Sequence, residues 1–118
     1  MKYVVLIYSN PAAWAGLPAE EADRVIKVHN DLIDELTGSG EFLNIYRLAG
    51  AGTARTVALR DGVPAVTDGP FGESKEVLAS LWELDVESLE RAVEIAAVLT
   101  PHATVEVRAL MDVAGMEM

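Results

Sequence analysis

The chain has 118 residues, of which 51% are hydrophobic, enough apolar side chain for one packed domain spanning 1–118. It carries 19 acidic and 9 basic residues, a formal net charge of -10, so we expect neither nucleic acid nor an anionic membrane as a partner. The sequence contains no cysteine, which excludes disulfides and thiol catalysis. Since no apolar run reaches the roughly 20 residues of a membrane span and no signal peptide is evident, we expect a cytoplasmic protein.

The first half of the chain has a strand pattern, then a helix pattern, then a second strand pattern. Residues 2–9 are rich in Val, Ile and Tyr, and both the odd and the even positions are largely apolar. This pattern predicts a strand that is buried on both faces. Apolar residues spaced by three and four predict a helix over 18–37, ended by Gly38 and Gly40. Residues 41–48 again have a strand pattern.

The second half starts with a predicted hairpin. Residues 56–60 and 63–67 flank Asp61-Gly62, the dipeptide most typical of a tight hairpin turn, and Pro64 suits an edge strand. A strand is predicted over 77–84, a helix over 87–100 capped by Asp85 or Ser88, and a last strand over 104–110. The predicted apolar stripe of this second helix comprises Leu89, Ala92, Val93, Ala96 and Ala97.

This order, βαβ, a hairpin and βαβ again, predicts an α+β fold of the ferredoxin-like kind, an antiparallel sheet with both helices on one face. The other face of the sheet is also apolar, so it needs a cover. A two-fold homodimer provides one, because a single patch then buries itself. The alternative is a monomer whose own hairpin and C-terminal tail cover this face.

Residues 68–76 read Asp-Gly-Pro-Phe-Gly-Glu-Ser-Lys-Glu. This segment resembles the Asp-Gly-Pro-Phe-x-Glu-x-Lys-Glu signature of the DGPF branch of the YCII-related proteins, and it matches at every defining position. The opening strand and the closing Val-Glu-Val-Arg at 105–108 are also similar to that family. The resemblance implies a dimeric α+β barrel, in which two ferredoxin-like sheets face each other.

The resemblance implies little about chemistry, because most members have no assigned activity. The wider YCII group is similar to muconolactone isomerase, and some relatives have a His and an Asp proposed as an acid–base pair. Members of this branch are often encoded beside extracytoplasmic-function sigma factors, which implies a regulatory or stress context.

His29 and Asp68 are the candidate catalytic residues. His29 lies on the apolar stripe of the first predicted helix, and an imidazole there can move a proton near neutral pH. Asp68 can accept a proton or orient His29. The structural alternatives are a core histidine and an aspartate that fixes the following turn through backbone N–H groups. Phe71, in the same signature, is expected to bury its ring as an anchor.

The candidate ligand-binding residues lie in the strands and in the signature. If the valines of the last strand face the helices, Arg108 points at the open face and can hold an anion there, unless it forms a structural ion pair. A cleft of this kind, suited to a small anionic or aromatic ligand, is expected to be lined by Arg108, Arg47, Tyr8 and Trp82. Glu73 and Lys75 either bind a polar ligand or are solvated.

No metal-ligand or nucleotide pattern is found. His29 and His102, with no cysteine, make no zinc signature, and His102 is expected in an exposed loop. We therefore expect no metal and no nucleotide cofactor. Three hypotheses remain: a cofactor-free isomerase or lyase using acid–base catalysis, a non-catalytic ligand-binding or regulatory module, and a structural dimer whose signature only builds a loop.

Overall fold

The alternation of strand and helix patterns produces one sheet and a separate hairpin. The computed structural model describes residues 1–72 and 74–118. The elements in chain order are β1 (Lys2–Ser9), α1 (Pro11–Ala15), α2 (Ala19–Ser39), β2 (Phe42–Arg47), the 3-10 turn η1 (Ala51–Thr53), β3 (Arg55–Arg60), β4 (Val63–Asp68), β5 (Val77–Asp85), α3 (Leu89–Val98) and β6 (Thr104–Ala109).

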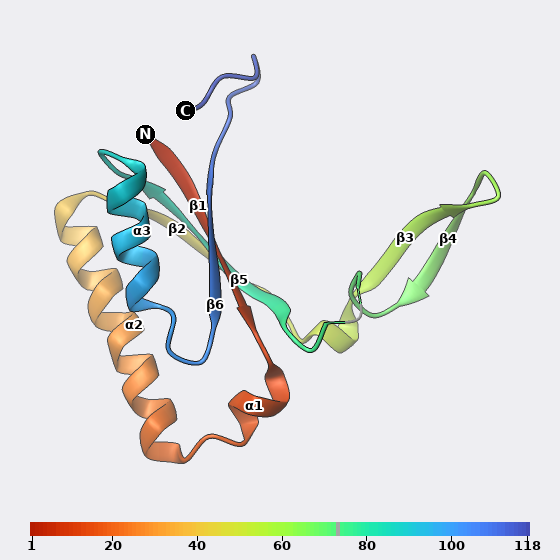
Figure 1. The fold of residues 1–118 in the computed structure, drawn as a ribbon, viewed down its shortest axis with the longest axis horizontal. Helices are drawn as coiled ribbons and strands as arrows, with labels where there is room; N and C mark the ends of the chain where they lie inside the picture. The colour runs from red at the N-terminus through yellow and green to blue at the C-terminus, as the bar shows by residue number, and fades with distance from the viewer. Residues whose placement is uncertain (73) are drawn as a thin grey trace.

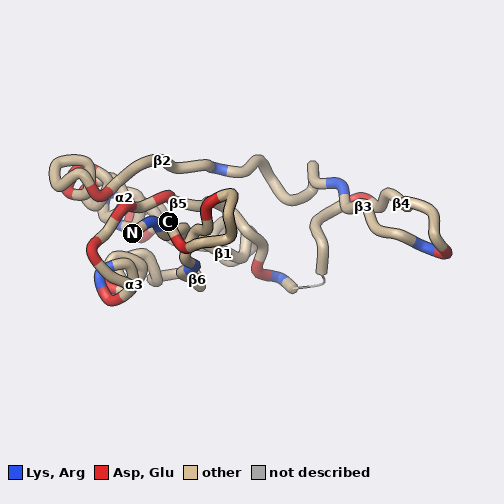
Figure 2. Tube along the Cα trace, turned by 90° about the horizontal axis from the view of Figure 1, so that it is seen from above, with Lys and Arg blue, Asp and Glu red and all other residues tan. Residues whose placement is uncertain are grey.

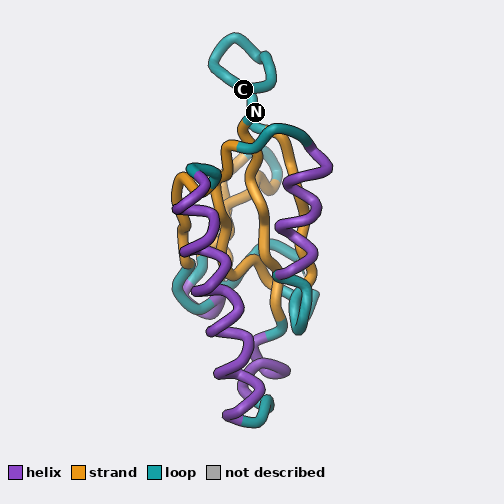
Figure 3. Tube along the Cα trace, turned by 90° about the vertical axis from the view of Figure 1, so that its left-hand side faces the viewer, coloured by secondary structure: helices purple, strands orange, loops and turns teal. Residues whose placement is uncertain are grey.

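Four of the strands form an antiparallel sheet in the order β2-β5-β1-β6, and β3 pairs with β4 in a two-stranded sheet. Helices α2 and α3 lie on the same face of the four-stranded sheet (Figures 1 and 3). Each of these helices joins two strands that have one other strand between them, which is the ferredoxin-like arrangement. The predicted α+β fold class is therefore confirmed.

The core lies between the sheet and the two long helices. Tyr3, Val5 and Ile7 of β1 point into it and are no more than 5% exposed. Trp82 and Leu84 of β5 lie beside them and are 1% and 0% exposed. The helices contribute Leu32, Leu36, Ala92, Ile95 and Ala96, with Leu99 just beyond α3. The alternate residues of β1, which are Val4, Leu6 and Tyr8, point to the other face of the sheet and are only half-buried. A single chain therefore covers one face of β1 and not both.

The helix ends follow local capping chemistry, with one correction to the sequence prediction. Gly40, at φ 82°, ends α2, whereas Gly38 lies inside the helix. Ser88 caps α3 by accepting a hydrogen bond from the backbone N–H of Arg91.

The apolar stripe of α3 was predicted correctly at Ala92 and Ala96 and wrongly at its other positions. Leu89 and Val93 are 48% and 51% exposed, while Ile95 and Leu99 are buried with Ala92 and Ala96. These four buried positions follow the three-and-four spacing from Ala92 onward.

The short helix α1 was not predicted. Asn10 caps it, because its Oδ1 accepts from the backbone N–H groups of Ala12 and Ala13. A five-residue helix has too few positions to produce a periodic pattern.

The hairpin β3–β4, called the arm below, forms as predicted around Asp61 and Gly62, at φ 52° and 79°. It projects from the end of the sheet where β2 stops and β5 starts, and it does not fold back over the open face (Figures 1 and 2). The tail pairs at the far end of β1 instead, where Lys2 N donates to the Met118 carbonyl. In this structure the arm and the tail therefore leave the open face of the sheet uncovered.

Phe71 was expected to bury its ring and does not. Its side chain is 91% exposed in this chain, in the connection between β4 and β5. The ring stays exposed because the connection starts from the projecting arm.

One ion pair ties the two βαβ halves together. Arg91 of α3 donates from Nε and Nη2 to the two carboxylate oxygens of Glu41, just before β2, at 2.8 and 2.9 Å. Ser39 Oγ donates to the same carboxylate at 2.7 Å. These hydrogen bonds, Arg91 first and then Ser39, lower the pKa of Glu41 from 4.5 to about 2.

We expect Glu41→Gln to lower the free energy of unfolding at pH 7 by about 1 kcal/mol, since the bidentate pair is partly solvated and screened. The folded-state pKa is depressed, so the pair stabilises the fold fully above about pH 4.5, and this contribution is lost as the pH falls towards 2. Urea unfolding at several pH values should show the variant and wild type converging over that range. A difference that stays constant on acidification would contradict the assignment. Glu94→Gln is the control, because Glu94 lies 3.8 Å from Arg91 and is exposed.

Candidate functional site

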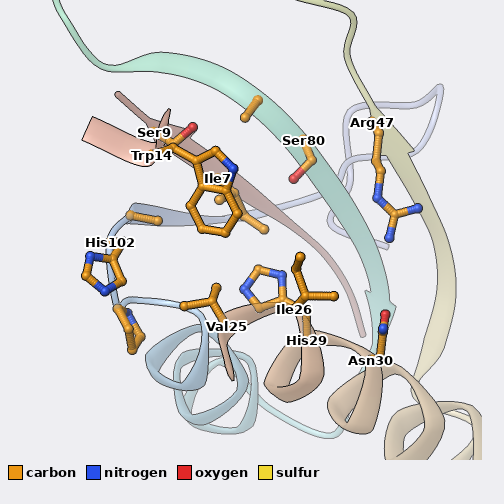
Figure 4. Close-up of a pocket in the computed structure, with 13 residues that line it drawn as sticks. Ile7, Ser9, Trp14, Val25, Ile26, His29, Asn30, Arg47, Ser80 and His102 are labelled. Atoms are coloured by element: carbon orange, nitrogen blue, oxygen red, sulfur yellow. The ribbon is translucent and has the colours of Figure 1, made fainter. Parts of the chain in front are cut away.

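A pocket opens on the helix side of the sheet, at the end of β1 and the beginning of α2. Its volume is about 300 Å³. Strands β1, β2 and β5, helices α1 and α2, and the loop after α3 all contribute to its walls. The lining residues are Ile7, Ser9, Trp14, Val25, Ile26, His29, Asn30, Arg47, Ala79, Ser80, Pro101, His102 and Ala103 (Figure 4).

His29 lies on the α2 wall of this pocket and is half-buried. Its ring packs edge-to-face on Trp82, with centroids 6.0 Å apart and planes at 89°. Burial first, and the positive charge of Arg47 second, lower the pKa of His29 from 6.5. The imidazole is therefore neutral at pH 7 and able to accept a proton.

Arg47 ends β2 and lies at one end of the pocket in Figure 4, with His102 at the other end. Arg47 pairs in register with Ser80, and Ile45, two residues earlier, pairs with the buried Trp82. Residues two apart on a strand share a face, so Arg47 is on the helix side of the sheet. Among residues 1–72 and 74–118, no carboxylate forms an ion pair with Arg47.

The walls that face His29 are largely apolar. Ile7 of β1 and Trp14 of α1 lie across the pocket from the imidazole (Figure 4). Trp14 is 38% exposed, although it is an aromatic side chain. Its place in the pocket could not be predicted from the sequence, because α1 is too short to have a periodic pattern.

His102 forms the other polar end of the pocket and was also missed as a lining residue. It is exposed, as expected for its loop, and its Nε2 lies 3.0 Å from Glu21 Oε1 on α2. Hydrogen bonds from Arg24 and then from His102 lower the pKa of Glu21. This contact fastens the loop after α3 to the first turn of α2.

The structure divides the predicted cleft between the two faces of the sheet. Arg47 lines the pocket, and Trp82 is buried beneath His29 at 1% exposure. Tyr8 and Arg108 are on the open face instead, where Tyr8 Oη donates to Glu106 Oε1 at 3.3 Å. Burial, and then the charge of Glu106, raise the pKa of Tyr8. The four residues therefore do not line one cleft within a chain.

The signature residues lie away from the pocket in this chain. Asp68 ends β4, is highly exposed, and pairs with Arg55 Nε at 3.2 Å. Its carboxylate is therefore not beside His29 within one chain. Lys75 is exposed in the connection to β5, and Glu73 lies outside the described residues.

The described part of the chain holds neither a metal-binding cluster nor a membrane-spanning helix. No group of three or more His, Cys, Asp or Glu side chains there has the geometry to hold a metal ion. No helix there is long and apolar enough to cross a membrane.

Comparisons with known proteins identify the family of the chain. The model of the YCII-related domain matches residues 1–113. The chain belongs to the YCII-related family. It is also similar to an uncharacterized protein of Rhizobium meliloti (strain 1021), with 30% identity over 96 residues, which is 81% of this chain and 77% of that protein. Neither match names an activity, so the chemistry has to be argued from the pocket.

We expect Arg47→Gln to raise the pKa of His29, because the substitution removes the nearby positive charge. The pKa should stay below 6.5, since burial, the larger cause, remains. The measurement is the pH titration of the His29 Cε1–Hε1 resonance by NMR. Arg108→Gln, on the opposite face, should leave the midpoint unchanged. An unchanged midpoint in Arg47→Gln itself would show that the two side chains are not electrostatically coupled.

Proposed function

We propose that the pocket binds a small anionic molecule and that His29 transfers a proton in a cofactor-free isomerase or lyase reaction. The observation that carries the proposal is a neutral, solvent-accessible imidazole in one pocket with a cation that has no ion-pair partner among the described residues. Perturbed titratable groups in a concave site are typical of functional sites.

The pocket suits a small ligand with one charged end. Its volume of about 300 Å³ is at the lower end for ligand sites. Arg47 offers a planar guanidinium for a carboxylate, and Ile7, Trp14 and Val25 offer apolar or aromatic surface for the rest of the molecule. An aromatic or unsaturated carboxylate, or a lactone with a carboxylate, combines these features.

The proton-transfer step needs no other reactant. The neutral His29 ring removes a proton from a carbon next to a carbonyl or carboxyl group and becomes imidazolium. The same proton returns to a different carbon, which gives an isomer and restores the neutral ring. Arg47 stabilises the negative charge that develops in between.

A non-catalytic ligand-binding or regulatory module is the second candidate, and one observation favours it. Burial and Arg47 account for the shifted pKa of His29, with no hydrogen-bonded carboxylate among the causes. A histidine base that lacks an orienting group is a weaker catalyst. As such a module, the protein would use the pocket to sense a ligand. This role fits the regulatory or stress context that the resemblance to proteins encoded beside sigma factors implies.

We assign the chain to the DGPF branch of the family and to the cytoplasm as part of the same proposal. Residues 68–76 support the branch, because they carry its signature at every defining position. The acidic, cysteine-free composition is compatible with the location.

The proposal includes a homodimer joined through the open face of the sheet. Val4 and Leu6 of β1 and Leu81 of β5 lie side by side there and are half-buried in the single chain. A two-fold partner would bury this patch against its own copy.

Benzoate tests the binding half of the proposal, with benzyl alcohol as its uncharged analogue. We expect wild type to bind benzoate more tightly than benzyl alcohol in isothermal titration calorimetry, with chemical-shift changes at His29. Arg47→Gln should weaken benzoate binding about tenfold or more, because it removes a charge-assisted hydrogen bond. Arg108→Gln is the matched arginine control on the other face. If Arg108→Gln alone weakens binding, the site is on the open face and the pocket assignment is wrong.

Levulinate, a keto acid with acidic C–H bonds, tests the proton-transfer half. We expect wild type in D₂O to exchange the C3 protons of levulinate faster than His29→Gln does, as measured by loss of their ¹H NMR signal. The buffer concentration is held fixed so that buffer catalysis cancels. Binding of benzoate without any His29-dependent exchange would favour the sensor over the enzyme.

A further inference from the structure

The arm has one face made of apolar side chains that nothing in the described part of the chain covers. In its register Val57 lies opposite Val66 and Leu59 lies opposite Pro64, and these two pairs are two residues apart along each strand. Directly opposed residues and their second neighbours share a face of a two-stranded ribbon. We call these four residues the arm face. Val57, Leu59 and Val66 are 62%, 71% and 64% exposed.

An isolated two-stranded hairpin is at best marginally stable in water, because it has no third layer on which to pack. The open arm face therefore needs a partner. Phe71, in the connection that leaves the arm, is 91% exposed and adds a large aromatic surface at its root.

The size of the exposed surface indicates how much a partner covers. A compact monomer of 12.7 kDa exposes about 6,200 Å², whereas this chain exposes 7898 Å². The excess of about 1,700 Å² is roughly twice what one protein gives up in a standard interface and suits an obligate dimer. The radius of gyration agrees, at 16.4 Å against about 13.5 Å for a compact chain of this length.

Charge indicates which partner fits. The arm carries Arg55, Arg60, Asp61 and Asp68, so its net charge is zero, and the whole formal charge of -10 lies on the rest of the chain. A basic or acidic partner would find no complementary charge on the arm. A second copy of this acidic chain, by contrast, can meet it without like-charge repulsion at the contact.

We propose that two copies of the chain exchange arms, the arm face of each packing against the other copy in a reciprocal two-fold dimer. The proposal concerns the arm and does not depend on any chemistry at His29. It also extends past a dimer joined only through the open sheet face, because Val57, Leu59 and Val66 lie on the separate β3–β4 hairpin and not on that face.

The test compares two doubly substituted proteins by sedimentation equilibrium. Leu59→Glu with Val66→Glu places two charges on the arm face. Ala58→Glu with Thr67→Glu places the same two charges on the opposite face of the arm, also at exposed positions. We expect the first protein to dimerise at least about 100-fold more weakly than wild type, because two buried apolar contacts are lost, and the second to stay within about fivefold.

A second measurement locates the contact directly. Isotope-labelled and unlabelled wild-type chains are refolded together, and isotope-filtered NOE spectra report only contacts between copies. Methyl groups of Val57, Leu59 and Val66 should give such contacts. Circular dichroism and thermal unfolding check that both substituted proteins keep the fold.

Three results would overturn the arm exchange: a monomeric wild type, an arm-face variant that dimerises like wild type, or methyl contacts confined to one chain. If the arm-face variant dimerises like wild type, a dimer joined through the open sheet face would still be possible. Benzoate binding is measured in a separate experiment, so a failure of the proposed function is distinguishable from a failure of the arm exchange.

Discussion

The packing around Trp82 is the interaction on which both the fold and the pocket depend. Trp82 is 1% exposed and lies between Val5 of β1 and Ile45 of β2 in the sheet register. Phe42 packs edge-to-face on its ring at 5.6 Å and His29 at 6.0 Å. A single side chain of β5 thus joins β1 and β2 and holds the imidazole at the inner wall of the pocket. The orientation of His29 is therefore set by the core, and the helix that carries it is positioned by the same contacts.

The two long helices cover only one face of the sheet, and this constraint separates the chemistry of the two sides. On the covered face, burial and Arg47 favour the neutral form of His29. On the open face, burial and Glu106 raise the pKa of Tyr8 and favour its neutral form. Neither group can assist the other through the sheet. Apolar surface that the helices do not cover is left on the open face and on the arm, and the two association proposals concern these surfaces.

The sequence predicted the order of elements because each has a periodic pattern or a turn dipeptide of its own, such as Asp61-Gly62. It also placed His29 on the inner stripe of α2. It could not predict the face of Arg47, because the register of β2 against β5 shifts between Phe42 and Asn44, and such a shift exchanges the faces of every later residue. Trp14 was missed because a five-residue helix has no periodicity. The exposure of Phe71 depends on where the arm points, which no local pattern encodes.

The acidity of the chain constrains what the pocket can select. A formal charge of -10 repels anions at a distance, so a ligand with one negative charge approaches more easily than a polyanion. Four of the basic side chains, Arg24, Lys27, Arg55 and Arg91, are neutralised by carboxylates. Arg47 has no such partner among the described residues and is the arginine that lines the pocket with His29. The long-range field thus disfavours highly charged molecules, while the guanidinium of Arg47 offers a local partner for a single negative charge. The proposed preference for small monoanions rests on these two effects together and requires no larger set of polar contacts.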